Sequence, residues 1–240
     1  MGVINTTMKE ITYRDALNEA LREEMERDED VFIFGEDVAE YGGANGVTRG
    51  LLEEFGGERI KDTPISEEVI TGATAGAAMV GTRPVGEIMF IDFLALGMSQ
   101  LANQGTKLRY MFGGKVKVPM VLRTQGGAHR SWGPQHGQSL EAWFMHVPGL
   151  YVVMPSTPYD AKGLLKTSIR NDNPILFIEH KAIYLNKGEI PEEEYTLPLG
   201  KAEVKREGKD VTLISYSRQV NYCQQAAEQL SEEGIEAEVI

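Results

Sequence analysis

The stretch Asp62-Thr63-Pro64-Ile65-Ser66-Glu67 ends a short predicted strand with a carboxylate and leads directly into a helix of small residues. Ser66 can cap this helix, and Glu67 and Glu68 lie near its positive N-terminal end. The helix continues as T-G-A-T-A-G-A-A-M-V at 71–80, with very little side-chain bulk on one face, so another part of the structure must approach its backbone closely. Tight packing beside a solvated Glu67 and a catalytic role for Glu67 both fit this pattern.

Composition sets broad limits on the function. The chain has 240 residues, 42% of them hydrophobic, and a formal net charge of -12, which argues against a nucleic-acid partner. The single cysteine cannot form an internal disulfide, and no apolar run reaches the ~18 residues of a membrane span. We therefore expect a cytoplasmic protein with no membrane segment.

Helix and strand patterns alternate along most of the chain. Thr12 is placed to cap a helix, V-F-I-F-G at 31–35 is a buried strand that Glu36 follows, and a glycine-rich loop comes next. The remaining predicted elements are strands at 84–90, 118–124, 150–155 and 174–180, and helices at 93–111, 141–146 and 159–170. This alternation predicts an α/β fold with a mostly parallel sheet flanked by helices, over residues 1–182.

The pattern changes near the C-terminus. Residues 183–200 are polar, acidic and proline-bearing, which predicts an interdomain linker. Residues 201–240 predict one β-α-β unit, with a helix at 219–232. A unit of this size is near the lower limit for independent folding, so we expect either an incomplete C-terminal domain of a truncated protein or a unit that leans on a partner.

The strand ends predict where a ligand lies. In open α/β sheets, ligands bind beyond the carboxyl ends of the strands, which selects Glu36, Glu67, 89–93 and the loop 125–138. The chain has no phosphate-binding loop, no dinucleotide-binding fingerprint, no zinc-type Cys/His spacing and no nucleophile elbow. We expect a ligand that is gripped at an apolar, aromatic end rather than at phosphates.

Four motifs, in this order, resemble the β subunit of thiamine-diphosphate-dependent 2-oxo acid dehydrogenases, whose members act on pyruvate, acetoin or branched-chain 2-oxo acids. They are D-T-P-I-S-E at 62–67, G-E-I-M-F-I-D-F at 86–93, Q-H-G-Q-S at 135–139 and P-S-T-P-Y-D-A-K-G-L at 155–164. The resemblance runs from Lys9 to Ile240 and implies a transketolase-like pyrimidine-binding domain followed by the start of a transketolase-type C-terminal domain.

The resemblance also implies roles for individual residues. Glu67 matches the carboxylate that hydrogen-bonds the pyrimidine N1′ of thiamine diphosphate and favours its imino tautomer. Glu36 matches a second acid that helps to hold a proton there, although on its own it could cap the next turn. Phe93 matches the aromatic side chain that packs on the pyrimidine, with Ile65 and Met89 as apolar walls; ordinary core packing is the alternative for Phe93.

His136 matches a histidine implicated in acyl transfer to a lipoyl group, where an imidazole can hold or deliver a proton near neutral pH. A lone loop histidine is more often a surface residue, and we interpret His129, His146 and His180 in that way. Arg130 and Trp132, in the same loop, replace small residues of pyruvate-specific members and bear on substrate or lipoyl access.

A structural potassium ion is a further implication of the resemblance. Backbone carbonyls of Met120, Ser168, Asn171 and Asn173 match its ligands in some relatives, while a helix C-cap and turn fits the same residues.

The implied function is that of a β subunit in an α2β2 heterotetramer, whose α subunit binds the diphosphate and Mg²⁺. The enzyme would oxidatively decarboxylate pyruvate, or cleave acetoin, and transfer the acyl group to the lipoyl group of an acyltransferase core. A branched-chain dehydrogenase β subunit and a catalytically idle, truncated partner module are the alternatives. A single-chain enzyme such as a transketolase is disfavoured, since 240 residues leave no room for a diphosphate-binding domain.

Overall fold

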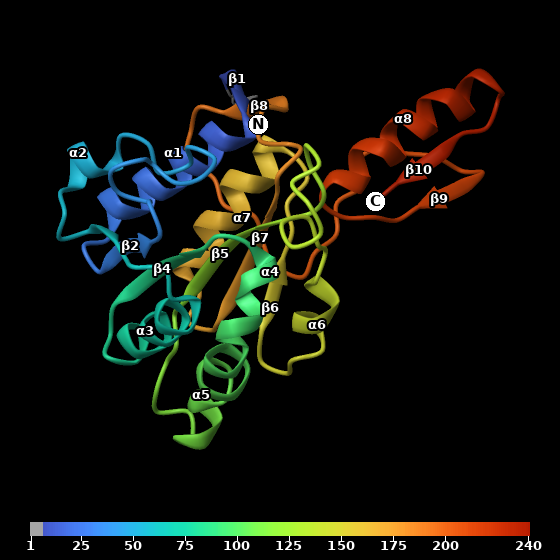
Figure 1. The fold of residues 1–240 in the computed structure, drawn as a ribbon. Helices are drawn as coiled ribbons and strands as arrows, with labels where there is room; N and C mark the ends of the chain where they lie inside the picture. The colour runs from blue at the N-terminus through green and yellow to red at the C-terminus, as the bar shows by residue number, and fades with distance from the viewer. Residues whose placement is uncertain (1–6) are drawn as a thin grey trace, which may run out of the picture.

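A six-stranded parallel sheet, in the order β3-β2-β4-β5-β7-β6, forms the centre of the molecule (Figure 1). The structure is a computed structural model and describes residues 7–240. The strands of this sheet are β2 (Val31–Gly35), β3 (Ile60–Asp62), β4 (Arg83–Ile88), β5 (Val121–Gly126), β6 (Tyr151–Val153) and β7 (Ile175–His180). The parallel α/β sheet predicted from the sequence is confirmed.

Helices cover both faces of the sheet, so alternate strand residues enter two separate cores. On β7, Ile175 and Phe177 join the core beneath α1 (Tyr13–Arg27) and α7 (Pro158–Arg170). Leu176 and Ile178 join the core beneath α3 (Glu67–Met79). Burial on both faces explains why these strands are continuous apolar runs. The α-helices of the large unit are α1 (Tyr13–Arg27), α2 (Leu51–Phe55), α3 (Glu67–Met79), α4 (Ile91–Leu94), α5 (Leu108–Met111), α6 (Glu141–Met145) and α7 (Pro158–Arg170).

The single helix predicted over 93–111 is wrong. The chain there forms α4, a 3₁₀ turn (η1, Ala95–Gly97), a π-helical turn (η2, Gln100–Gly105) and α5. A Cβ placed on Gly97 would lie 2.3 Å from Oγ1 of Thr71, so this segment runs against the small-residue face of α3. The expected close approach to α3 is thereby confirmed, and it bends the approaching segment out of regular α-helix.

Part of the predicted linker packs onto the large unit. Strand β8 (Lys187–Pro191) pairs antiparallel with β1 (Met8–Thr12), and Ile183, Tyr184 and Ile190 are buried. The chain stays on this unit beyond β8: the Tyr195 hydroxyl donates to the Tyr159 carbonyl at 3.1 Å, the Leu197 amide donates to the Gly163 carbonyl at 3.2 Å, and Leu199 packs against the core. The domain boundaries given above remain predictions.

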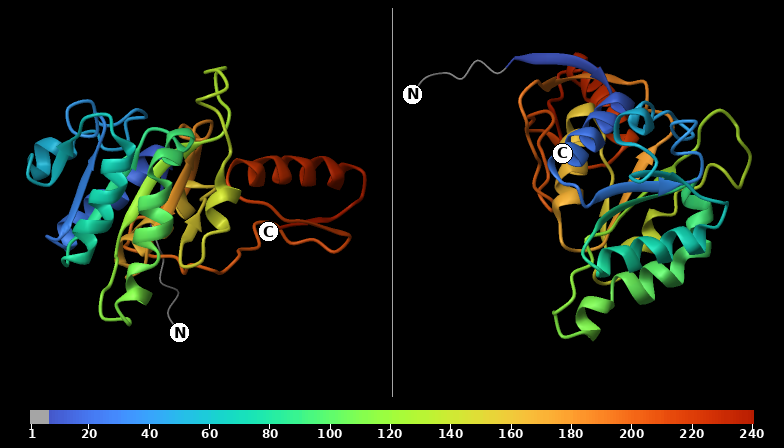
Figure 2. Two further views of the ribbon diagram at one scale, coloured as in Figure 1. Left: turned by 60° about the horizontal axis from the view of Figure 1, so that its bottom comes forward. Right: turned by 90° about the vertical axis from the view of Figure 1, so that its left-hand side faces the viewer.

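The C-terminal unit has the predicted β-α-β connectivity: β9 (Val211–Leu213), α8 (Arg218–Glu232) and β10 (Ala237–Val239), with the two strands parallel. It extends beyond the β6 edge of the large sheet (Figure 2). Lys205 pairs with Asp160 at 2.8 Å, and the Tyr216 hydroxyl donates to Glu141 at 3.1 Å, which ties the two units together. Among residues 7–240, no helix combines the length and apolar character needed to cross a membrane.

Candidate functional site

The site forms where the strand order reverses. After β2 the chain crosses to β3 on one side, and after β4 it crosses to β5 on the other, which puts the switch point of the sheet between the carboxyl ends of β2 and β4. Glu36 directly follows β2, and Met89 directly follows β4. The strand-end rule therefore predicted correctly that these two residues lie at the carboxyl edge of the sheet.

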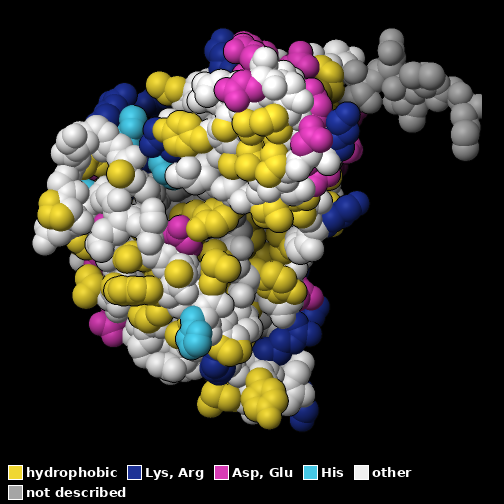
Figure 3. Space-filling view, turned by 90° about the vertical axis from the view of Figure 1, so that its right-hand side faces the viewer, with side chains coloured by type: hydrophobic (Ala, Val, Ile, Leu, Met, Phe, Trp, Pro, Cys, Tyr) yellow, Lys and Arg dark blue, Asp and Glu magenta, His cyan; other side chains and the backbone are white. Residues whose placement is uncertain are grey.

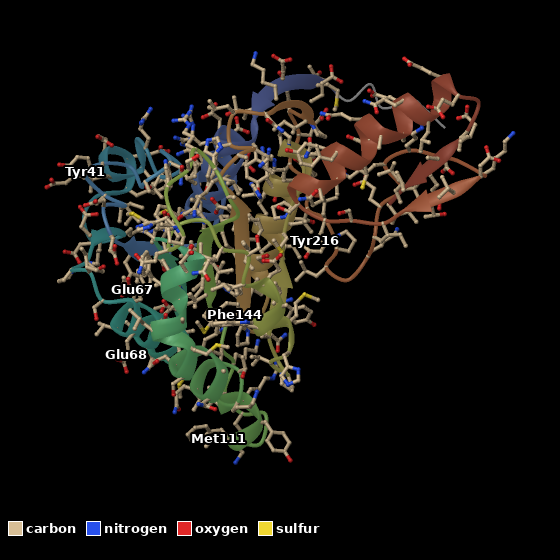
Figure 4. The ribbon with its side chains drawn as sticks, turned by 45° about the vertical axis from the view of Figure 1, so that its right-hand side comes forward. Tyr41, Glu67, Glu68, Met111, Phe144 and Tyr216 are labelled. Atoms are coloured by element: carbon tan, nitrogen blue, oxygen red, sulfur yellow. The ribbon has the colours of Figure 1, made fainter. Side chains whose placement is uncertain are left out.

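Glu67 is the first residue of α3, and its side chain is buried rather than solvated. Figure 4 shows it at the start of the helix beside α4, with Glu68 next to it. Ser66 occupies the N-cap position but makes no side-chain capping hydrogen bond, contrary to expectation. A buried carboxylate at a helix N-terminus lies in a favourable field, because the free backbone N–H groups carry partial positive charge.

Glu36 and Glu67 act on each other electrostatically. Both residues are 8% exposed, and Oε1 of Glu36 is buried without a hydrogen-bond partner among the described residues. Burial raises the pKa of Glu36, and the negative charges of Glu67, Asp37 and Glu87 raise it further. The protonated form of Glu36 is therefore favoured by its burial and by the neighbouring negative charges.

Behind this pair lies a fully buried ionic network that the sequence did not predict. Arg123 on β5 donates to Glu87 on β4 at 2.7 Å and to Glu179 on β7 at 2.6 Å. Gln125 also donates to Glu87, at 2.8 Å, and the Tyr184 hydroxyl donates to Glu179, at 2.6 Å. The one signal in the sequence was a charged or polar residue inside each of three buried strands, which requires buried partners.

The apolar residues predicted around the cofactor differ in exposure. Ile65 is 81% exposed, whereas Met89 and Phe93 are half-buried. Ile65 follows β3, and Met89 and Phe93 follow β4, so all three lie at the carboxyl edge of the sheet. Their contacts with a pyrimidine remain predictions.

His136 lies in the loop of residues 127–139, which follows β5 and is here named the His136 loop; it projects from the sheet in Figure 2. The imidazole meets the rings of Phe93 and Phe90 edge to face, at centroid distances of 5.2 and 5.8 Å. The ring of Trp132 packs against that of Phe90, with 5.7 Å between the two ring centroids. The structure therefore brings His136 and Phe93 together, as their shared position at the strand ends suggested.

Two other histidines differ from the expectation of plain surface residues. His180 ends β7 half-buried, and its Nδ1 accepts a hydrogen bond from the Ala182 amide at 3.1 Å. Burial lowers the pKa of His180 to about 4, with further lowering by Arg218, Lys181 and His129. His129 packs against Trp132 at 6.4 Å, and burial followed by the charge of Arg130 lowers its pKa. Figure 3 shows Lys, Arg and His side chains gathered at the upper left of one face.

The residues predicted to bind potassium occupy a helix end and the turn after it. Asn171 is the C-cap of α7 and its amide donates to the Ser168 carbonyl, while the Met120 carbonyl accepts from Ile175. Nη1 of Arg83 donates to the Asn171 carbonyl at 3.2 Å, so a cationic side chain already meets one predicted ligand. Potassium binding stays a prediction.

Lys181 was missed by sequence reasoning, whereas Asp92 lies within the stretch 89–93 that the strand-end rule selected, although no role was predicted for it. Lys181 follows β7, and its Nζ donates to the His136 carbonyl at 2.6 Å; Asp92 precedes Phe93 on α4 and accepts from Gln138. The position of Lys181 directly after β7 is the signal that could have identified it.

Comparison with known proteins agrees with this architecture. Residues 9–186 match the pyrimidine-binding domain of transketolase, and residues 200–240 match the transketolase C-terminal domain. A split-gene transketolase, described as an inactive β4 tetramer, has the same fold with a TM-score of 0.74 at 22% identity, over 95% of this chain and 70% of that one.

Curated relatives are much more similar in sequence. The β subunit of acetoin:2,6-dichlorophenolindophenol oxidoreductase from Bacillus subtilis is 51% identical, over 96% of this chain and 71% of the relative. The 2-oxoisovalerate dehydrogenase β subunit from the same organism is 49% identical, over 97% and 72%. The mitochondrial pyruvate dehydrogenase E1 β subunit of Dictyostelium discoideum is also 49% identical, over 97% and 66%. The chain therefore belongs to the transketolase-type family that contains these dehydrogenase β subunits.

Proposed function

We propose that this chain is the β subunit of a thiamine-diphosphate-dependent dehydrogenase component that acts on pyruvate or acetoin. The observation that carries the proposal is the buried Glu36 and Glu67 pair at the switch point of the sheet. Relatives of about half-identical sequence, named as β subunits of acetoin:2,6-dichlorophenolindophenol oxidoreductase and of pyruvate dehydrogenase E1, support it.

The residues present fit the pyrimidine end of this cofactor. Oε1 of Glu36 is a buried acceptor that lacks a partner among residues 7–240. The negative charge of Glu67 raises the pKa of Glu36. Glu67 would hold a proton at a pyrimidine nitrogen, and Glu36 would keep that proton from being lost to solvent. Phe93, Met89 and Ile65 would contact the apolar ring. The bound cofactor supplies a nucleophilic carbon for attack on the substrate carbonyl.

The diphosphate and Mg²⁺ are assigned to an α subunit. The described part of the chain contains no cluster of three His, Cys, Asp or Glu side chains arranged for a metal ion, and the sequence has no phosphate-binding loop. Large apolar side chains are exposed on α3, on the segment after α4 and on α5: Val69, Leu96, Tyr110, Met111 and Phe112. We infer that the α subunit of an α2β2 heterotetramer covers these side chains. A lipoyl-bearing acyltransferase core is the proposed acceptor of the acyl group.

The 2-oxoisovalerate dehydrogenase β subunit, at 49% identity, makes a branched-chain 2-oxo acid the second candidate substrate. The test is dye-coupled turnover of pyruvate, acetoin and 2-oxoisovalerate by this chain, co-expressed with its α subunit and supplied with thiamine diphosphate and Mg²⁺. Preference for pyruvate or acetoin supports the proposal. Preference for 2-oxoisovalerate selects the alternative, and a folded complex that turns over none of the three contradicts both.

A further inference from the structure

A buried ion pair ties both ends of a short segment around His136 to the sheet. Nζ of Lys181 donates to the His136 carbonyl at 2.6 Å. Two residues later, the backbone amide and the side-chain amide of Gln138 both donate to Oδ1 of Asp92, at 3.1 and 3.0 Å. Segment 136–138 is therefore held by groups that follow β4 and β7, the two neighbours of the strand from which its loop departs.

Lys181 is confined by its surroundings. Its side chain is 0% exposed, and Nζ lies 4.1 Å from the centroid of the Phe90 ring and 3.9 Å from Oδ2 of Asp92. Burial lowers the pKa of Lys181, and the Asp92 carboxylate opposes that effect. A buried ammonium group is stable only where such partners surround it, so the lysine has one favourable position.

The lysine's position determines where the imidazole lies. Lys181 fixes the backbone carbonyl of His136, and Phe90 contacts both the lysine ammonium and the imidazole ring. Because the lysine side chain has no exposed surface, it cannot reach a substrate in solution. Its contacts are those of a group that holds another residue in place, as reacting groups require.

We propose that Lys181 is a positioning residue that, with Asp92, holds His136 against Phe90 and Phe93 for acyl transfer. This inference rests on the proposed function, in which His136 serves that step. The contact with the loop itself can be tested without any activity.

The first test is hydrogen exchange in the full chain with its α subunit. The Gly127 amide donates to the Gln138 carbonyl at 3.0 Å and so reports whether the His136 loop is closed on itself. In Lys181→Met, exchange at Gly127 and across 136–138 should accelerate by about tenfold. Asp92→Asn combined with Lys181→Met, which avoids leaving an unpaired buried carboxylate, should do the same. Lys187→Met is the matched control, since Lys187 is 62% exposed and pairs with Glu10 on β1.

The second test separates the two half-reactions. In Lys181→Met, acylation of a lipoyl domain should fall by about tenfold while dye-coupled turnover falls by less than about twofold, because acylation depends more strongly on His136. Lys181→Arg, which keeps the charge, should recover part of the loss. Unchanged hydrogen exchange of the His136 loop in Lys181→Met and in the double variant overturns the proposal. An equal loss of both half-reactions in Lys181→Met does so too. A wild-type complex without either half-reaction contradicts the proposed function instead, and the exchange result still decides whether Lys181 holds the loop.

Discussion

Nε of Arg123 donates to Oε1 of Glu179 at 2.6 Å where both side chains are fully buried, in the middle of a parallel sheet. The same guanidinium donates to Glu87, whose charge contributes to the raised pKa of Glu36. One arginine thus pairs with both carboxylates that lie behind the candidate site. Burial raises the pKa of Glu179 to about 6, although Arg123 lowers it, which shows how strongly burial opposes the charged form.

Removal of this arginine should severely destabilise the fold. In Arg123→Met, Glu87 and Glu179 lose their cation, and we expect the free energy of unfolding to fall by about 3 to 4 kcal/mol. Urea denaturation followed by circular dichroism measures the loss. Adding Glu87→Gln and Glu179→Gln should restore much of it, because no unpaired charge remains. A loss below about 1 kcal/mol in the single variant would show that the network is not the main support of these strands.

Two glycines near α3 should respond in opposite ways to alanine. A Cβ on Gly97 would lie 2.3 Å from Thr71 Oγ1 and 3.1 Å from the Glu67 carbonyl, whereas a Cβ on Gly76 meets nothing within 4 Å. Gly97→Ala should destabilise the fold by about 2 kcal/mol and displace the start of α3. Gly76→Ala should stabilise it by about 0.5 kcal/mol, since alanine is the better helix former. Thermal unfolding measures the midpoint temperature of each variant. A shift of both midpoints in the same direction would contradict the predicted difference.

The contact between Gly97 and Thr71 shows how far the sequence could predict the fold. The strand at 31–35 and the helix at 159–170 were predicted because local periodicity determines them, and they appear as β2 and α7. The interruption of the helix after Phe93 depends on Gly97 meeting Thr71, which is a contact between distant segments. Local pattern carries no information about such a contact.

The site shows the same division. The strand-end rule found Glu36, and the cap pattern found Glu67, because both depend on neighbours in sequence. Lys181 was not found, since its role comes from contacts with His136 and Phe90 across two loops. His180 was misread because its burial depends on the approach of Gly127, whose Cβ would lie 2.2 Å from the imidazole.

His180 should make the fold sensitive to mild acid. Its pKa is lowered from 6.5 to about 4 in the folded chain, so the unfolded chain takes up the proton first as the pH falls. The neutral imidazole contributes its full stability above about pH 6.5, and this contribution is lost as the pH falls to about 4. After allowance for solvent screening, the loss in the free energy of unfolding is roughly 1 kcal/mol. Urea unfolding at about pH 7.5 and about pH 5 should show a smaller drop in His180→Asn than in wild type or in the control His146→Asn. An equal drop in all three would assign the acid sensitivity to other groups.

His136 should affect the two half-reactions unequally. Its ring centroid lies 5.2 Å from that of Phe93 in a half-buried position, where an imidazole can serve a proton transfer. In His136→Ala, acylation of a lipoyl domain should fall by about a hundredfold, and dye-coupled turnover by less than about tenfold. His146→Ala, at the exposed end of α6, is the matched control. If both half-reactions of His136→Ala fell by the same factor, the assigned role in acyl transfer would be wrong.

Glu67 and Glu68 offer the sharpest comparison, because they are adjacent carboxylates of which only the first is buried (Figure 4). Glu67→Gln removes the group that would hold a proton at the pyrimidine, so dye-coupled turnover should fall by about a hundredfold or more while thermal unfolding changes little. Glu68→Gln alters an exposed side chain that accepts from Gln100 at 2.7 Å, and turnover should stay within about twofold of wild type. Titration of thiamine diphosphate into each purified complex, followed by circular dichroism, separates lost binding from lost activation. Wild-type turnover in Glu67→Gln would remove this carboxylate from the mechanism, and with it the main support for the assigned function.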